Sequence, residues 1–200
     1  MTRHPGQHRP GFLDPWRRPL YPRLPWHLIL AASIAGTLTI ATLELGQDLS
    51  GTPLLVGAFG SSCVLLFLAP NGPFSHPANV VGGHLTAAAC GIAVSTVLPG
   101  AWWALAAGMG LAMAAMAALR VVHAPAGATA LSVMISGASW DYLVSPLLAG
   151  ALVLSTCSLL YRWLLWRSVG PPPAYGPLPD QGEPAGLTRS AARAGRGTAD

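Results

Sequence analysis

Residues 57–84 read GAFGSSCVLLFLAPNGPFSHPANVVGGH, an apolar run that a proline-rich turn interrupts before it resumes. The run before the turn, Val56 to Ala69, would cover only about 21 Å at a helical rise of about 1.5 Å per residue. The hydrocarbon core of a bilayer is about 30 Å thick. The stretch therefore predicts a short helix inside a membrane, followed by a second helix that begins at Pro77.

The start of this short helix is built from small residues, Gly60, Ser61 and Ser62. Backbone N–H groups in the first turn of a helix lack intrahelical partners, and small side chains let a ligand approach them closely. Such a start can hold an anion without a fixed positive charge. We therefore take these three residues as candidate anion-binding residues.

A similar arrangement recurs 67 residues later in the chain. The segment VGAFGSS at residues 56–62 aligns with HAPAGAT at residues 123–129, and Gly83 aligns with Gly150. The recurrence predicts a second short helix, Gly127 to Gly137, of about 16 Å. Gly127, Ala128 and Thr129 would lie in its first turn.

The composition places the chain in the membrane class. Hydrophobic residues make up 52% of the sequence and charged residues 9%. Long neutral runs of this kind are typical of segments that span a bilayer. The formal charge of +4 comes from arginines that lie mainly in the two tails, so we expect the lipid bilayer as a partner and no nucleic acid.

Four apolar runs are long enough to be full spans: Trp26–Leu43, Pro77–Leu98, Trp102–Val122 and Tyr142–Trp166. With the two short helices they make six membrane-inserted segments of an all-α protein. Small residues form one stripe at Gly83, Ala87 and Gly91 and another at Ala104, Gly108 and Ala112. Such stripes permit close helix packing. The three cysteines lie in apolar runs, and we expect them to be small core residues without a disulfide.

The arginines predict the orientation. Five arginines precede the first span, and Arg162 and Arg167 close the last, which places both termini in the cytoplasm of a bacterial-type inner membrane. Residues 1–24 and 168–200 would be disordered cytoplasmic tails around a membrane domain at 25–167. Because each half contains three segments, the halves would form an inverted repeat. The two short helices would then point their starts at a shared midplane site.

Three ordered motifs resemble the HPP family of integral membrane proteins: GAFGSSCVLLF at 57–67, PANVVGGH at 77–84 and HAPAGATAL at 123–131. The resemblance covers Trp26 to Trp166. The motif that names the family, His-Pro-Pro, reads His123-Ala124-Pro125 here, which loosens the turn. Plant and cyanobacterial members are linked to nitrite transport. The resemblance therefore implies a transporter or channel for a small monovalent anion, with nitrite as the leading candidate.

The candidate substrate-binding residues combine the two helix starts with three polar residues nearby. They are Gly60, Ser61, Ser62, Asn79, His84, His123, Gly127, Ala128 and Thr129. The two histidines could modulate transport or carry a coupled proton, or could only form structural hydrogen bonds. Asn79 could cap its helix or bond across to the other short helix.

Two other function classes stay open at this stage. His76, His84 and His123 could form a metal site of a transporter or metalloenzyme, although no apolar segment adds a carboxylate. A structural or regulatory membrane subunit is the second alternative. We expect no enzymatic activity, no cofactor and no resident metal. A homo-oligomer is expected because four full spans shield a polar midplane poorly.

Overall fold

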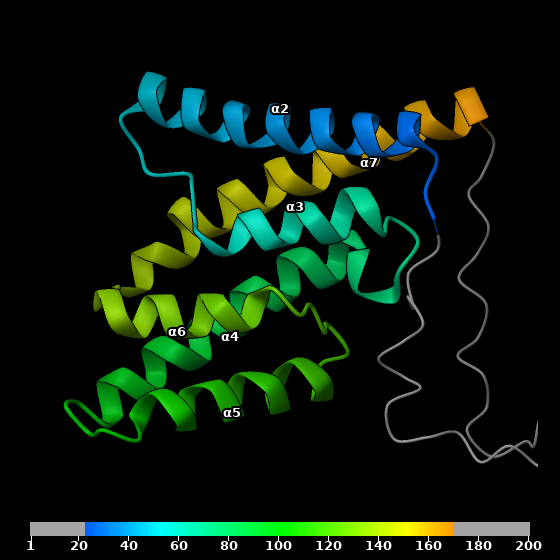
Figure 1. Ribbon diagram of the computed structural model, residues 1–200. Helices are drawn as coiled ribbons and strands as arrows, with labels where there is room; N and C mark the ends of the chain where they lie inside the picture. The colour runs from blue at the N-terminus through cyan, green and yellow to red at the C-terminus, as the bar shows by residue number, and fades with distance from the viewer. Residues whose placement is uncertain (1–22, 170–200) are drawn as a thin grey trace, which may run out of the picture.

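The computed structural model describes residues 23–169, and this part of the chain is entirely helical (Figure 1). Its α-helices are α2 (Trp26–Ser50), α3 (Ala58–Leu68), α4 (Pro77–Val97), α5 (Ala104–Ala118), α6 (Ala126–Ser136) and α7 (Ala149–Val169). The connections contain the 3₁₀ turns η1 (Pro73–Ser75) and η2 (Trp140–Leu143) and the π-helical turn η3 (Val144–Leu148). The tails expected at 1–24 and 168–200 lie almost wholly outside the described residues.

The helices run back and forth along a common direction, so that α3 and α6 point in opposite directions (Figure 1). Both are short, with 11 residues each, as the sequence predicts. Within residues 23–169, three segments are long and apolar enough to cross a membrane: Trp26–Ser50, Pro77–Val97 and Trp140–Ser168. The fourth expected span, α5, has only 15 helical residues. Its helix ends just before Arg120, whose φ is 57°. Four full crossings therefore stay a prediction.

Two helix boundaries differ from the prediction. Helix α2 continues past Leu43 to Ser50 because one internal glycine is tolerated in a helix, and it ends where Gly51 adopts a φ of 65°. The last helix was expected from Tyr142, but regular α-helix begins only at Ala149. Ser145, with φ −136° and ψ 125°, departs from helical geometry just before Pro146.

The predicted small-residue stripes are confirmed as close packing surfaces. Helix α4 packs against α5 and α6. A Cβ atom placed on Gly91 would lie 2.6 Å from the carbonyl oxygen of Ala130, so only glycine lets these two backbones approach. Gly108 of α5 lies directly against the sulfur of Met134 in the same way. The three cysteines are free, as expected.

Two glycine contacts are related by the 67-residue shift seen in the sequence. A Cβ on Gly83 would lie 2.9 Å from the carbonyl oxygen of Val121, just before α6. A Cβ on Gly150 would lie 2.6 Å from the carbonyl oxygen of Leu54, just before α3. Each long helix therefore packs its glycine against the segment that leads into the other half's short helix.

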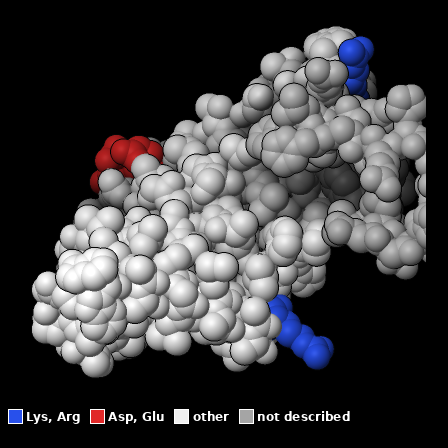
Figure 2. Space-filling model, turned by 60° about the horizontal axis from the view of Figure 1, so that its bottom comes forward, with Lys and Arg blue, Asp and Glu red and all other residues white. Residues whose placement is uncertain are grey.

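Charged side chains gather at opposite ends of the molecule. Figure 2 shows the acidic residues at one end of the visible face and basic residues at the other. Glu44 and Asp48 lie in the C-terminal part of α2 and Asp141 lies in η2. Arg120 follows α5, and Arg167 lies in the last turn of α7. The two ends therefore differ in charge, with a neutral middle.

Candidate functional site

Four fully buried polar side chains meet where the two short helices begin. Ser62 comes from α3, His84 from α4, Thr129 from α6, and His123 from the segment just before α6. Each is 0% exposed. Buried polar groups in an apolar protein are unfavourable unless they find hydrogen-bond partners, so this central cluster is held together by its own bonds.

Ser62 lies at the centre of the central cluster. Its Oγ is 3.0 Å from Nε2 of His84 and 3.0 Å from Nε2 of His123. His84 continues the chain of contacts, because its Nδ1 is 2.7 Å from Oγ1 of Thr129. These residues are 22 to 61 positions apart in the sequence, so only the tertiary fold creates the cluster.

The proline-rich turn orients His123. Nδ1 of His123 is 2.9 Å from the carbonyl oxygen of Phe74 in η1. A carbonyl oxygen only accepts, so Nδ1 must carry the hydrogen. In the neutral imidazole, Nε2 then presents its lone pair to the Ser62 hydroxyl, which donates to it.

The central cluster has one more polar contact than its neutral side chains have hydrogens. The five contacts join Phe74 O to His123, His123 to Ser62, Ser62 to His84, Ser62 to Ala58 O at 3.1 Å, and His84 to Thr129. Two neutral imidazoles and two hydroxyls supply only four hydrogens. A proton on Nε2 of His123 would let Ser62 donate to Ala58 O, and every contact would then hold one hydrogen.

Rings and a glycine fix the positions of the two histidines. The Phe59 ring packs edge-on against His84 with 5.2 Å between the ring centroids. The two imidazole centroids are 5.0 Å apart. Gly83 lies behind His123, since a Cβ there would be 2.7 Å from Cβ of His123. The Phe59 ring and the close approach of Gly83 therefore hold the two imidazoles in position.

Several N–H groups at the starts of the two short helices are bonded within their own turns. In α3, the N–H groups of Phe59 and Gly60 donate to Val56 O at 2.8 Å and Gly57 O at 3.3 Å. The N–H groups of Ala126, Gly127 and Ala128 likewise donate to carbonyls three residues earlier. Tight turns at both helix starts satisfy these groups, so the side chains of the central cluster are the polar groups at this point.

The other predicted site residues lie apart from the central cluster. Gly60, Ser61 and Ala128 are exposed, and Oγ of Ser61 donates to Ala58 O at 2.8 Å. Ser61 and Ala128 line a surface groove of about 680 Å³ between α3 and α6. Gly127 is buried beside the Met109 side chain. Nδ2 of Asn79 donates to Pro73 O in the preceding turn at 2.8 Å, whereas the side-chain cap of α4 is His76, which accepts from the N–H of Ala78.

Comparison with known proteins decides the family. Residues 21–170 match the transmembrane region of the HPP family. The chain belongs to the HPP family. It is an integral membrane protein, and the first residue of the altered HPP motif, His123, belongs to the central cluster.

Two transmembrane proteins of Dictyostelium discoideum are similar to this HPP protein. One is 34% identical over 138 residues, covering 64% of this chain and 44% of the relative. The other is 30% identical over 138 residues, covering 64% of this chain and 48% of the relative. The chain thus spans about half the length of these relatives. No solved structure matches it.

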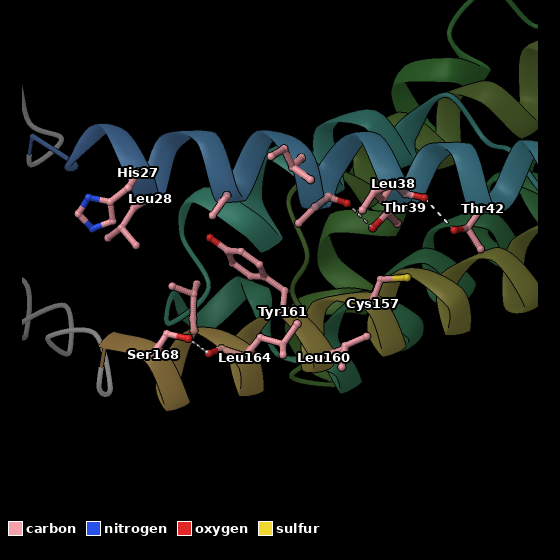
Figure 3. Close-up of a pocket in the computed structure, with 14 residues that line it drawn as sticks. His27, Leu28, Leu38, Thr39, Thr42, Cys157, Leu160, Tyr161, Leu164 and Ser168 are labelled. Atoms are coloured by element: carbon pink, nitrogen blue, oxygen red, sulfur yellow. Dashed lines mark hydrogen bonds between the residues drawn. The ribbon is translucent and has the colours of Figure 1, made fainter.

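An apolar groove of about 600 Å³ lies between α2 and α7 of the HPP protein (Figure 3). Thr39, Thr42 and Ser168 line it, and each hydroxyl donates to the carbonyl four residues earlier. The remaining lining is mainly aliphatic. The groove therefore suits hydrocarbon and offers little to an ion.

The three histidines of the alternative metal site are not grouped. Nδ1 of His76 accepts from the N–H of Ala78 at 3.3 Å, and His76 is exposed. Within residues 23–169, no group of three or more His, Cys, Asp or Glu side chains could hold a metal ion. The geometry thus joins His84 with His123 but leaves His76 at the helix cap.

Two contributors to the HPP cluster are absent from the sequence interpretation. Phe74 acts through its backbone carbonyl, which carries no sequence signal. Phe59 supplies the ring against His84. A signal for Phe59 exists in its position three residues before Ser62, one helical turn away on the same face.

Proposed function

We propose that this HPP protein moves a small monovalent anion across the membrane, with nitrite as the leading candidate, and that the anion binds at the central cluster. The observation that carries the proposal is the meeting of four fully buried hydrogen-bonding side chains at the starts of two opposed short helices. The cluster contains no acidic side chain. An anion that enters among its hydroxyl and imidazole groups would replace some of their mutual contacts and accept hydrogen bonds in their place.

Weak binding suits turnover at such a site. The positive ends of two helix dipoles favour an anion near the starts of α3 and α6. Partial charges and hydroxyl donors hold it less tightly than a buried guanidinium would, and a transported ion must also leave. The turn-bonded N–H groups act through the dipole, while Ser62 and Thr129 supply the direct donors.

We also consider a proton at the central cluster. The fifth contact of the cluster gains its hydrogen when His123 is protonated, and the resulting positive charge favours an anion beside it. We propose that proton uptake at His123 accompanies anion binding. Phe74 then keeps Nδ1 of His123 fixed in both protonation states.

An inverted repeat would place this site between two related halves. The reciprocal glycine contacts of Gly83 and Gly150 support the repeat, as do the opposite directions of α3 and α6. The shift aligns Ser62 with Thr129 but aligns the two histidines with Val56 and Ala151, which are apolar. The proposed proton site therefore belongs to one half only.

We also propose that the protein works as a homo-oligomer. The groove between α3 and α6 leaves Ser61, Ala124 and Ala128 at the surface, close to the start of both short helices. Two short helices cannot separate this region from lipid by their own length. A second copy of the chain packed on this face would cover it.

Uptake into vesicles that contain only this protein tests the function. We expect nitrite uptake above that of protein-free vesicles at the same pH, rising as the pH falls because His123 takes up a proton. His84→Ala should flatten this pH dependence, since it removes one imidazole of the network. Uptake no faster than the protein-free background for nitrite and related anions would favour the structural-subunit alternative.

A further inference from the structure

Three buried polar groups on α7 have no hydrogen-bond partner. Within residues 23–169 these are the only such buried side-chain atoms: Oγ of Ser155, Oγ of Ser158 and Nε of Arg162. Ser155 is 6% exposed and Ser158 is 1% exposed. Other hydroxyls on this helix behave differently, because Thr156 donates to Leu152 O at 2.8 Å. An unpaired buried hydroxyl is unfavourable, so these groups call for a partner.

The three groups form one stripe along the helix. Spacings of three and four residues place Ser155, Ser158 and Arg162 on the same face, spread over about 11 Å. Ser155, Ser158 and Arg162 are not among the α7 residues that line the apolar groove, which are Cys157, Leu160, Tyr161, Leu164, Leu165 and Ser168 (Figure 3). The burial of Ser155 and Ser158 places these two hydroxyls in the protein interior.

The chemistry of the α7 stripe suits an anion. Two hydroxyls and a guanidinium N–H can all donate, and the guanidinium is positively charged. The carbon Cζ of Arg162 lies 5.1 Å from the centroid of the Trp166 ring, which positions the group without using Nε. The described acidic residues gather at the opposite end of the molecule (Figure 2). A cation would find no carboxylate here.

The α7 stripe begins near the central cluster. Ala151, one turn before Ser155, is the position that the 67-residue shift aligns with His84. Gly150 packs directly against the Phe59 ring, which also lies edge-on against His84 at 5.2 Å between centroids. From this point the stripe runs toward the end of α7 that carries Arg167. The equivalent positions on α4 are Ala88, Gly91 and Ser95, so the charged stripe exists in one half only.

From these observations we propose that Ser155, Ser158 and Arg162 form a second binding site for a small inorganic anion, between the central cluster and the arginine-bearing end of the membrane domain. The site rests on the proposed anion function, since it would take the same class of ligand. This second site would bind the anion next to the fixed positive charge of Arg162, whereas the central cluster binds it weakly.

The test uses the purified full chain and the midpoint of its thermal unfolding in sodium nitrite, compared with sodium gluconate at equal ionic strength. A ligand that binds the native state raises this midpoint. The variants are the double substitution S155A/S158A and Arg162→Gln, with Thr156→Ala as the matched control. Ser62→Ala is measured alongside to isolate the central cluster.

We expect S155A/S158A to keep or raise the midpoint in gluconate, because the unpartnered hydroxyls are removed, and to weaken nitrite binding roughly tenfold or more. Arg162→Gln should weaken it similarly. Thr156→Ala should match the wild type, and Ser62→Ala should retain part of the nitrite effect.

An unchanged nitrite effect in S155A/S158A would overturn the second site. So would a clear fall of its midpoint in gluconate, because the hydroxyls would then have structural partners. A wild-type midpoint that nitrite does not move also overturns it. The proposed function is tested separately, by nitrite uptake of the wild type and its loss in Ser62→Ala. The two proposals can therefore fail independently.

Discussion

At the scale of the residue, two neighbouring serines of α3 differ in role. Ser62 bonds to two buried imidazoles, whereas Ser61 is exposed and bonds only to its own helix. One step along a helix turns a side chain by about 100°, which separates the interior from the surface. The pair therefore gives a matched test of the central cluster.

Ser62→Ala should abolish most nitrite uptake and lower the free energy of unfolding by about 1–3 kcal/mol, because Nε2 of both histidines loses a partner. Thr129→Val should act similarly through the lost contact with Nδ1 of His84. Vesicle uptake and chemical denaturation measure the two effects. The control Ser61→Ala should change neither by much, and equal effects of Ser61→Ala and Ser62→Ala would contradict the cluster.

The altered family motif gives the second residue-scale prediction. Ala124 is exposed, and none of the described backbone bonds uses its N–H as a donor. Ala124→Pro should therefore raise the free energy of unfolding by about 0.4–1 kcal/mol by restricting the unfolded chain. Thermal unfolding checks this. A lower midpoint would mean that proline moves His123 away from Phe74.

At the scale of the element, α4 and α7 each pack a glycine against the segment that leads into a short helix. A Cβ on Gly83 would meet Cβ of His123 at 2.7 Å and the Val121 carbonyl at 2.9 Å. A backbone carbonyl cannot rotate away as a flexible side chain can. The position of α4 therefore fixes the position of His123, and with it the geometry of the central cluster.

Gly83→Ala should cost about 1–3 kcal/mol of unfolding free energy and reduce uptake, because the added methyl displaces His123. Gly150→Ala should cost a similar amount through the Leu54 carbonyl, at 2.6 Å from the added atom. Denaturation of purified variants measures this. Gly110→Ala on α5 is the control, since nothing lies within 4 Å of its Cβ position. A Gly83→Ala protein as stable as the Gly110→Ala protein would refute the close approach.

At the scale of the whole molecule, the separation of charges predicts the orientation in the membrane. The start of α2 and the end of α7 lie at the same end of the bundle (Figure 1). Glu44, Asp48 and Asp141 belong to the opposite end. Positive charges favour the cytoplasmic side, so the end with Arg120 and Arg167 should face the cytoplasm.

Reporter fusions after Trp166 and after Asp141 test this orientation. We expect activity of a cytoplasmic reporter only after Trp166 and of an outer-face reporter only after Asp141. Fusions before Trp26 should agree with those after Trp166. If the fusions at the two ends of the membrane domain report opposite sides, the number of crossings is odd and the inverted repeat is wrong.

The sequence by itself determined the membrane class, the two short helices and the small-residue packing stripes. Each depends on local composition and periodicity, which a single segment carries. The HPP resemblance, confirmed by the family match, rests likewise on contiguous motifs. Helix ends were predicted less well, since the first span was expected to end at Leu43, while α2 continues to Ser50 and ends at the left-handed Gly51.

Only the tertiary structure decided which polar residues act together. Ser62 and His123 are 61 positions apart, and their 3.0 Å contact depends on how α3, α4 and α6 pack. The tertiary structure also turned Ser61 to the surface, bonded the helix-start N–H groups within tight turns, and left Ser155 and Ser158 without partners. Hydrogen bonds between distant segments depend on the spatial direction of each side chain, and residue type alone does not specify that direction.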